Sequence, residues 1–128
     1  MAEAHIIWTE AFIVQSGFAS GAQYHIARFA AANTVNVASL KTDSAICGVT
    51  QTKPGNPGEN VTVGVLGLSK VFAGGTISAN AYATTDGSGR AVAAGSGDMV
   101  FGRPLVTTAA GNVYTFIIFP PVRWAGAI

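Results

Sequence analysis

Apolar residues recur at every second position in the middle of the chain, and this period constrains the fold more than any other feature. Val61, Val63 and Val65 alternate with polar residues or glycine, which places the three valines on one face of an extended strand. Three other runs, at residues 34–39, 45–51 and 112–119, are short, β-branched or aromatic, and bounded by turn-forming residues. Such a set of strands predicts an all-β fold, a small barrel or sandwich.

The residues between these runs are typical of turns. Residues 53–60 (KPGNPGEN) and 86–89 (DGSG) combine proline with residues that adopt a positive φ at little steric cost. The one helix candidate, residues 22–33, has alanines and some apolar periodicity but no clean cap, so we favour strand or irregular structure there.

Length predicts a single domain, and composition predicts that part of its surface is buried against other chains. The chain has 128 residues, which is enough for one core. Charged residues make up only 10% and hydrophobic residues 49%. A surface with so few charges is poorly suited to a free monomer, even though many of the apolar residues are small alanines. We therefore expect self-association or a place in a larger assembly.

The distribution of charge and cysteine excludes several classes. The net charge is +1 and the basic residues lie singly, so we expect no nucleic-acid partner. Cys47 is the only cysteine, which excludes an intramolecular disulfide and a cysteine-based zinc site. The N-terminus lacks the pattern of an export signal. Residues 104–122 contain three prolines, so we expect no membrane span.

Two segments 54 residues apart resemble each other. In each, two apolar residues precede a glycine, Gly48 or Gly102, and a loop then leads to an alternating strand. This predicts two similar hairpin units within one domain. Chance similarity between short glycine-containing strands is the alternative.

Large aromatic residues gather near both chain ends, where polar residues are usual. They could pack on the domain's own core or dock into a groove of another subunit, because Trp and Tyr favour both places. The candidate interface residues are Ile6, Ile7, Trp8, Phe12, Val14, Phe18 and Trp124. We expect residues 1–33 to form an N-terminal arm and entry segment, 34–119 the β-rich domain, and 120–128 a C-terminal tail.

The sequence offers no catalytic or cofactor-binding constellation. His5 and His25 lack metal-ligand spacing, and the six acidic residues lie singly. The Gly-Ser-Gly triplets at 87–89 and 95–97 lack the third glycine and the helix of a dinucleotide-binding loop. We expect no enzyme activity, no cofactor and no metal.

Three segments in a fixed order resemble the head decoration, or capsid cement, proteins of tailed bacteriophages. They span residues 34–63, 70–92 and 97–118, about two-thirds of the chain, and include KVFAGGTI, DGSGRA and GDMVFG. Asn80 departs from the glycine usual in that family, but asparagine tolerates left-handed backbone. The resemblance implies a compact β-rich homotrimer on the outer surface of the virion. There it would bind the expanded head at junctions between major capsid protein subunits.

Two ideas about contacts follow from the resemblance and the aromatic ends. Residues 4–14 could add as a strand to a sheet of the capsid or of a neighbouring subunit. The leading alternative function is a carbohydrate- or receptor-binding β module, which needs exposed aromatic residues beside Asn, Asp or Gln, and residues 80–82 are the one hint of this pattern.

Overall fold

The computed structural model describes residues 5–14, 23–53, 56 and 58–124, with the backbone alone for residues 5–7. Nine strands and no helix occur in these ranges. All nine belong to one hydrogen-bonded sheet with the order β1-β3-β2-β4-β5-β9-β8-β6-β7, and β1 also pairs with β5. This confirms the expected all-β fold.

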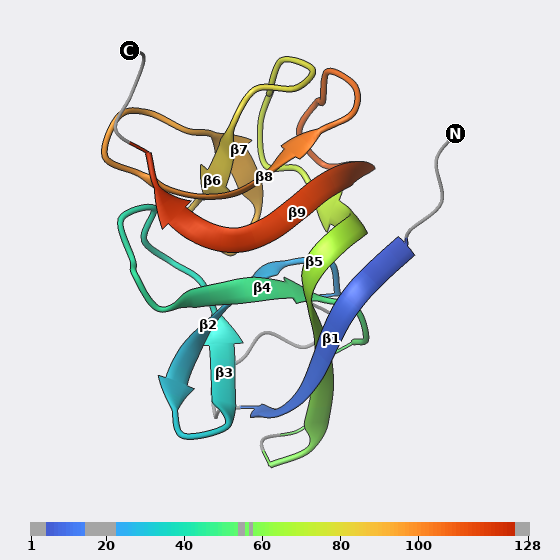
Figure 1. Ribbon diagram of the computed structural model, residues 1–128, viewed down its shortest axis with the longest axis vertical. Helices are drawn as coiled ribbons and strands as arrows, with labels where there is room; N and C mark the ends of the chain where they lie inside the picture. Colours follow the sequence, from blue (N-terminus) through green and yellow to red (C-terminus); the bar gives the residue numbers. More distant parts are fainter. Residues whose placement is uncertain (1–4, 15–22, 54–55, 57, 125–128) are drawn as a thin grey trace.

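The first five strands close into a small barrel, which forms the lower half of the molecule in Figure 1. These strands are β1 (His5–Val14), β2 (Ile26–Ala31), β3 (Thr34–Val37), β4 (Ile46–Thr50) and β5 (Asn60–Phe72). The ring closes because β1 pairs with β3 in parallel at one end and with β5 in antiparallel along its length. Closure satisfies the backbone groups that an open edge would leave unpaired.

The other four strands extend the sheet from the second half of β5 and form the upper half of the molecule (Figure 1). They are β6 (Ala83–Thr85), β7 (Ala91–Ala93), β8 (Met99–Pro104) and β9 (Val113–Arg123). The long strand β5 therefore joins the two halves, since residues 60–68 pair with β1, residues 63–64 with β4 and residues 67–72 with β9.

Each half has its own core. The barrel encloses Val14, Ala27, Val35, Cys47, Val61 and Val63. A larger cluster, which includes Ile26, Phe101, Phe116 and Ile118, fills the space between the barrel strands and the C-terminal strands. The alternation predicted around Val61 and Val63 is the inward-facing side of β5.

The two segments that resemble each other occupy equivalent positions in the sheet. Gly48 on β4 lies opposite Ala27 of β2, and Gly102 on β8 lies opposite Ala83 of β6. A Cβ at Gly48 would lie 2.2 Å from the backbone oxygen of Gly64, and a Cβ at Gly102 would lie 2.4 Å from that of Ile117. Both glycines therefore allow the same close approach to the following strand of their hairpin.

The boundaries differ from the expected arm and tail. Residues 5–14 form β1, a wall of the barrel, and β2 also precedes residue 34. At the other end, β9 continues to Arg123, where Met99 pairs with it. The reason is that Val14 completes the barrel core, a contact between distant parts of the chain that local sequence does not reveal.

The left-handed backbone expected at Asn80 is confirmed, with φ of 66°. Tyr24 and Asn33 also have positive φ, and Asn33 forms the tight turn between β2 and β3.

Candidate interaction surface

The candidate residues on β1 separate into surface and core. Trp8 exposes 49% of its surface, and its indole nitrogen donates a hydrogen bond to Glu10 Oε2 at 2.8 Å. Phe12 is half-buried and meets Phe29 edge-on, with ring centroids 5.4 Å apart. Val14 is only 2% exposed. Trp8 is therefore available to a partner, whereas Val14 serves the barrel.

The other candidates are only partly described. Ile6 and Ile7 lie in β1, but their side chains are outside the described part of the structure, and Phe18 lies outside the described residues altogether. Trp124 is half-buried at the end of β9, where its backbone N–H donates to the carbonyl of Asp98 at 2.8 Å.

Trp124 belongs to a surface cluster that we call the aromatic cluster, formed by Tyr82, Arg103 and Trp124. The rings of Tyr82 and Trp124 are 5.2 Å apart and tilted by 56°. The guanidinium carbon of Arg103 lies 5.7 Å from the centre of the Tyr82 ring, within the range of a cation–π contact. Tyr82 remains 38% exposed. Trp, Tyr and Arg are the residue types most enriched at the energetic centres of protein interfaces.

The sheet brings this cluster together from three separate segments. Ala83 pairs with Gly102, which places Tyr82 beside Arg103, and Ile117 lies directly opposite Arg103 on β9. Ile117 is 38% exposed and extends the apolar area. Sequence reasoning found Trp124 but missed Tyr82 and Arg103 as its neighbours, because only non-local strand pairing joins them.

Large apolar side chains are exposed at many places on the described surface. They are Trp8, Ile13, Phe29, Leu40, Tyr82, Val106, Val113, Ile117 and Val122. Apolar residues scattered singly on a surface are usual, so they indicate a binding site only where they gather, as in the aromatic cluster.

Two ion pairs hold loops rather than line a site. Arg28 on β2 pairs with Asp43 in the loop before β4, and Asp43 also accepts a hydrogen bond from the Ala45 backbone at 2.8 Å. Burial raises the pKa of Asp43, but the hydrogen bonds from Arg28 and Ala45 and the positive charge of Arg28 outweigh it, so the pKa lies below its usual value. Arg90 pairs with Asp86 at 2.9 Å.

Cys47 is held inside the barrel. Its side chain is 6% exposed, and burial raises the pKa of the thiol to about 12. The thiol is therefore protonated at neutral pH and poorly nucleophilic. Cys47 therefore serves as a small residue of the barrel core.

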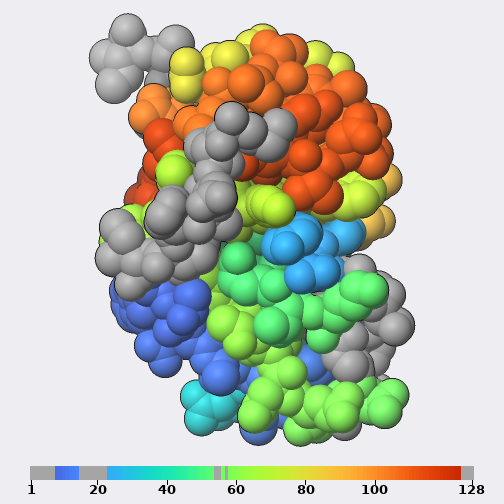
Figure 2. Space-filling view, turned by 90° about the vertical axis from the view of Figure 1, so that its right-hand side faces the viewer, coloured from blue at the N-terminus to red at the C-terminus, as the bar shows by residue number. Residues whose placement is uncertain are grey.

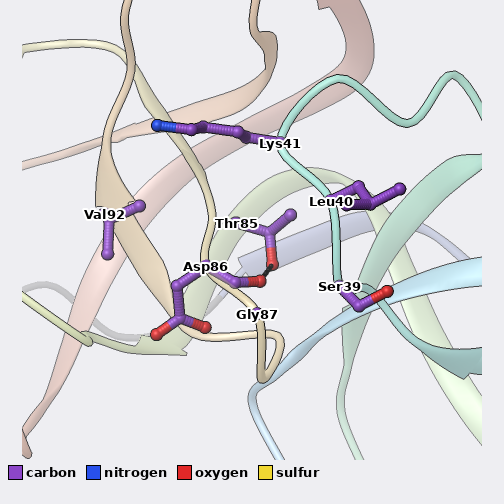
Figure 3. A pocket seen from close by; sticks show the side chains of 7 residues that line it. All are labelled: Ser39, Leu40, Lys41, Thr85, Asp86, Gly87 and Val92. Carbon is purple, nitrogen blue, oxygen red and sulfur yellow. Dashed lines mark hydrogen bonds between the residues drawn. The ribbon is translucent and has the colours of Figure 1, made fainter.

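An open hollow of about 330 Å³ lies between the segment after β3 and the strands β6 and β7 (Figure 3). Its lining residues are Ser39, Leu40, Lys41, Thr85, Asp86, Gly87 and Val92. The Asp86 carboxylate points away from Lys41 in Figure 3. Its oxygens accept hydrogen bonds from the backbone of Ser88 and from Arg90. The carboxylate thus holds its own turn.

Within the described ranges, no group of three or more His, Cys, Asp or Glu side chains could hold a metal ion. Nor does that part of the chain contain a helix long and apolar enough to cross a membrane. The described residues form a small β-barrel with four further strands, and the aromatic cluster on its surface has the composition of a protein interface.

Comparison with solved structures relates this fold to a phage head protein. The chain is similar to the N-terminal base of the head fiber protein gp8.5 of bacteriophage phi29, with a TM-score of 0.64 and 19% sequence identity. The similarity covers 87% of this chain and 92% of that chain. No family model matches the sequence, and no curated protein matches it. The chain thus has the fold of a phage head-associated protein, in agreement with its sequence resemblance to head decoration proteins.

Proposed function

We propose that this chain is a decoration, or cement, protein that binds the outer surface of the assembled, expanded phage head at junctions between major capsid protein subunits. The observation that carries the proposal is the match to a head-fiber base over nearly the whole of both chains. The resemblance of residues 34–63, 70–92 and 97–118 to decoration proteins supports it independently, and from that resemblance we take the homotrimer as the acting unit.

Such a protein stabilises a shell by binding one state of it in preference to others. A ligand that binds only the expanded lattice shifts the equilibrium away from unexpanded or ruptured heads by its differential affinity. A trimer that contacts several subunits together gains avidity without a tight single contact. A modest interface per copy is therefore sufficient.

The aromatic cluster is the part of the described surface best suited to the head contact. Tyr82 and Trp124 offer a large apolar area, and Arg103 adds one positive charge held over a ring. The contact would depend little on salt, because apolar burial is not screened by ions.

The proposal is tested with purified protein and undecorated heads, both expanded and unexpanded, by co-sedimentation and electron microscopy. We expect occupancy on expanded heads only, and a higher temperature of genome release from decorated heads. Replacement of the anchor, Trp124→Ala, should weaken binding about 30-fold, since interface anchors contribute about 2 kcal/mol or more. The matched control is Val113→Thr, which changes an exposed apolar residue at the start of β9, the strand that Trp124 follows. If the protein bound neither expanded nor unexpanded heads, the proposal would be refuted.

A specific observation favours a second candidate, a carbohydrate- or receptor-binding module. Asn80 is exposed on the turn before Tyr82, so an amide lies close in sequence to exposed aromatic rings. Aromatic rings with a nearby hydrogen-bonding group are suited to sugar recognition. A glycan array separates the two functions: glycan binding without head binding would favour the second candidate over the first.

A further inference from the structure

Most of the long outer edge of β1 has no strand partner among the described residues. β1 pairs with β3 only at Ile13 and Val14, and its other pairings are all with β5 on the opposite side. In Figure 1, β1 lies at the outside of the barrel, and in Figure 2 it forms part of the surface on that side.

The direction of the backbone groups along this edge follows from the regular register. From Thr9 to Ile13 the pairing with β5 is constant, so alternate residues direct their N–H and C=O groups to the same side. Ile13 donates its N–H to Asn33 on the side away from β5. Ala11 and Thr9 therefore direct their backbone groups to the same outer side.

Other edges of the sheet are very short or contain proline, whereas the edge of β1 carries only one charge and a local irregularity in its pairing with β5 at Trp8. β7 has only three residues, and Gly74 donates to its Ala91 carbonyl. The last part of β9, beyond its pairing with β5, contains Pro120 and Pro121, which lack an N–H. Residues 8–11 of β1 are exposed and contain neither proline nor lysine, and Glu10 is their one charged residue.

We propose that this edge of β1 pairs in antiparallel orientation with the same edge of a second copy of this chain, around a two-fold axis at Thr9. A symmetric pairing could be centred at Thr9, at Glu10 or at Ala11, the first three residues of the regular stretch. A centre at Ala11 would bring the second strand onto Ile13, whose N–H is already used. A centre at Glu10 would set the two carboxylates against each other, which is unfavourable.

The register centred at Thr9 keeps the two carboxylates apart, and only His5, the first residue of β1, would reach Ile13 of the second copy. It pairs Thr9 with Thr9 of the second copy and sets Glu10 opposite the second copy's Trp8. Within one chain the Trp8 indole already donates to the Glu10 carboxylate, so the same donor would lie near the carboxylate of the second copy. Threonine pairs are also among the favourable cross-strand pairs.

The contact between two copies does not depend on the proposed function. Its role on the head, described next, does rest on that function. A two-fold contact cannot close a ring of three copies, so it would join chains from neighbouring trimers on the head surface. Decoration trimers would then stabilise the shell through one another as well as through the capsid protein.

Cysteine cross-linking tests the register on the full-length protein, without heads. In a paired strand the two Thr9 positions lie about 5.5 Å apart between Cα atoms, within disulfide range. The two Glu10 positions would be diagonal neighbours about 7–8 Å apart, at or beyond that range. The native Cys47 is buried, so it contributes little background.

We expect Thr9→Cys to form a covalent dimer with oxidised glutathione, at least tenfold faster than Glu10→Cys. Ala11→Pro in the Thr9→Cys background should abolish the dimer, because it removes an outward N–H and leaves the β5 ladder in place. Equal rates for the two cysteine variants, a faster reaction at residue 10, or no dimer from either would overturn the proposal. Head binding is measured separately, so failure of the contact is distinguishable from failure of the decoration function.

Discussion

A methyl group added at Gly48 or Gly102 tests the close strand approaches on which both halves of the molecule depend. The Cβ of Gly48→Ala would lie 2.2 Å from the oxygen of Gly64 and 2.8 Å from Cγ1 of Val63, and that of Gly102→Ala 2.4 Å from the oxygen of Ile117. Ordinary carbon–oxygen contacts are about 3.3–3.6 Å, so one strand must move by about 1 Å. The nearest atoms are backbone atoms inside a sheet, and they cannot turn away as a side chain would.

The cost follows from these distances. Overpacking of this kind costs about 1–3 kcal/mol, and the lower entropy of the unfolded alanine chain returns about 0.4–1 kcal/mol. Each variant should therefore lose about 1–2 kcal/mol of unfolding free energy, which for a chain of this size lowers Tm by about 4–8 °C.

The assay is thermal and urea denaturation of both variants beside a matched control, Gly87→Ala. Gly87 lies in an exposed turn, and a Cβ there would meet nothing within 4 Å. We expect this control to change stability by less than about 0.5 kcal/mol. If Gly48→Ala and Gly102→Ala were as stable as the control, the strand spacing described here would be wrong, and with it the equivalence of the two hairpin units.

Two further predictions concern titration and access. The depressed pKa of Asp43 contributes stability that is present above the unfolded value of about 3.8 and is lost as pH falls through the lower folded pKa. Asp43→Asn should remove this part of the acid dependence, about 1 kcal/mol for a partly exposed pair, and an unchanged acid-unfolding curve would contradict it. Cys47, with a pKa of about 12, should react with a thiol reagent at neutral pH only at the rate of unfolding, so that labelling follows denaturant concentration. Rapid labelling of the native protein would contradict its burial in the barrel.

The sequence predicted the strands whose pattern is local and missed the contacts that are not. Alternation at Val61 and Val63 identified β5, but burial does not alternate at residues 64–68, where the strand passes from the barrel to its pairing with β9. The closing contact of the barrel is the parallel pairing of Ile13 with Thr34. Parallel pairing between separate segments has no local turn signal, so residues 5–14 resembled a free arm.

The same reasoning explains the candidate surface. Aromatic residues near the chain ends could pack on the domain's own core or on another chain, and the structure shows both kinds of position on a single strand. Phe12 packs against the barrel core, whereas Trp8 is half exposed. The difference depends on how far the barrel extends along β1. Strand pairing sets that extent, and hydrophobicity along the sequence does not report it.

Because β1 is a barrel wall, truncation is a poor test of its contacts. Removal of residues 1–14 would delete Val14 from the core and expose the edges of β3 and β5. Loss of head binding by such a variant would follow from loss of the fold alone. Substitutions at exposed positions avoid this problem. Thr9→Cys leaves every inward-facing side chain of the barrel unchanged, and Trp124→Ala changes a half-buried residue that belongs to neither core cluster. An effect of either variant on assembly, with an unchanged unfolding midpoint, therefore reports a contact with another chain.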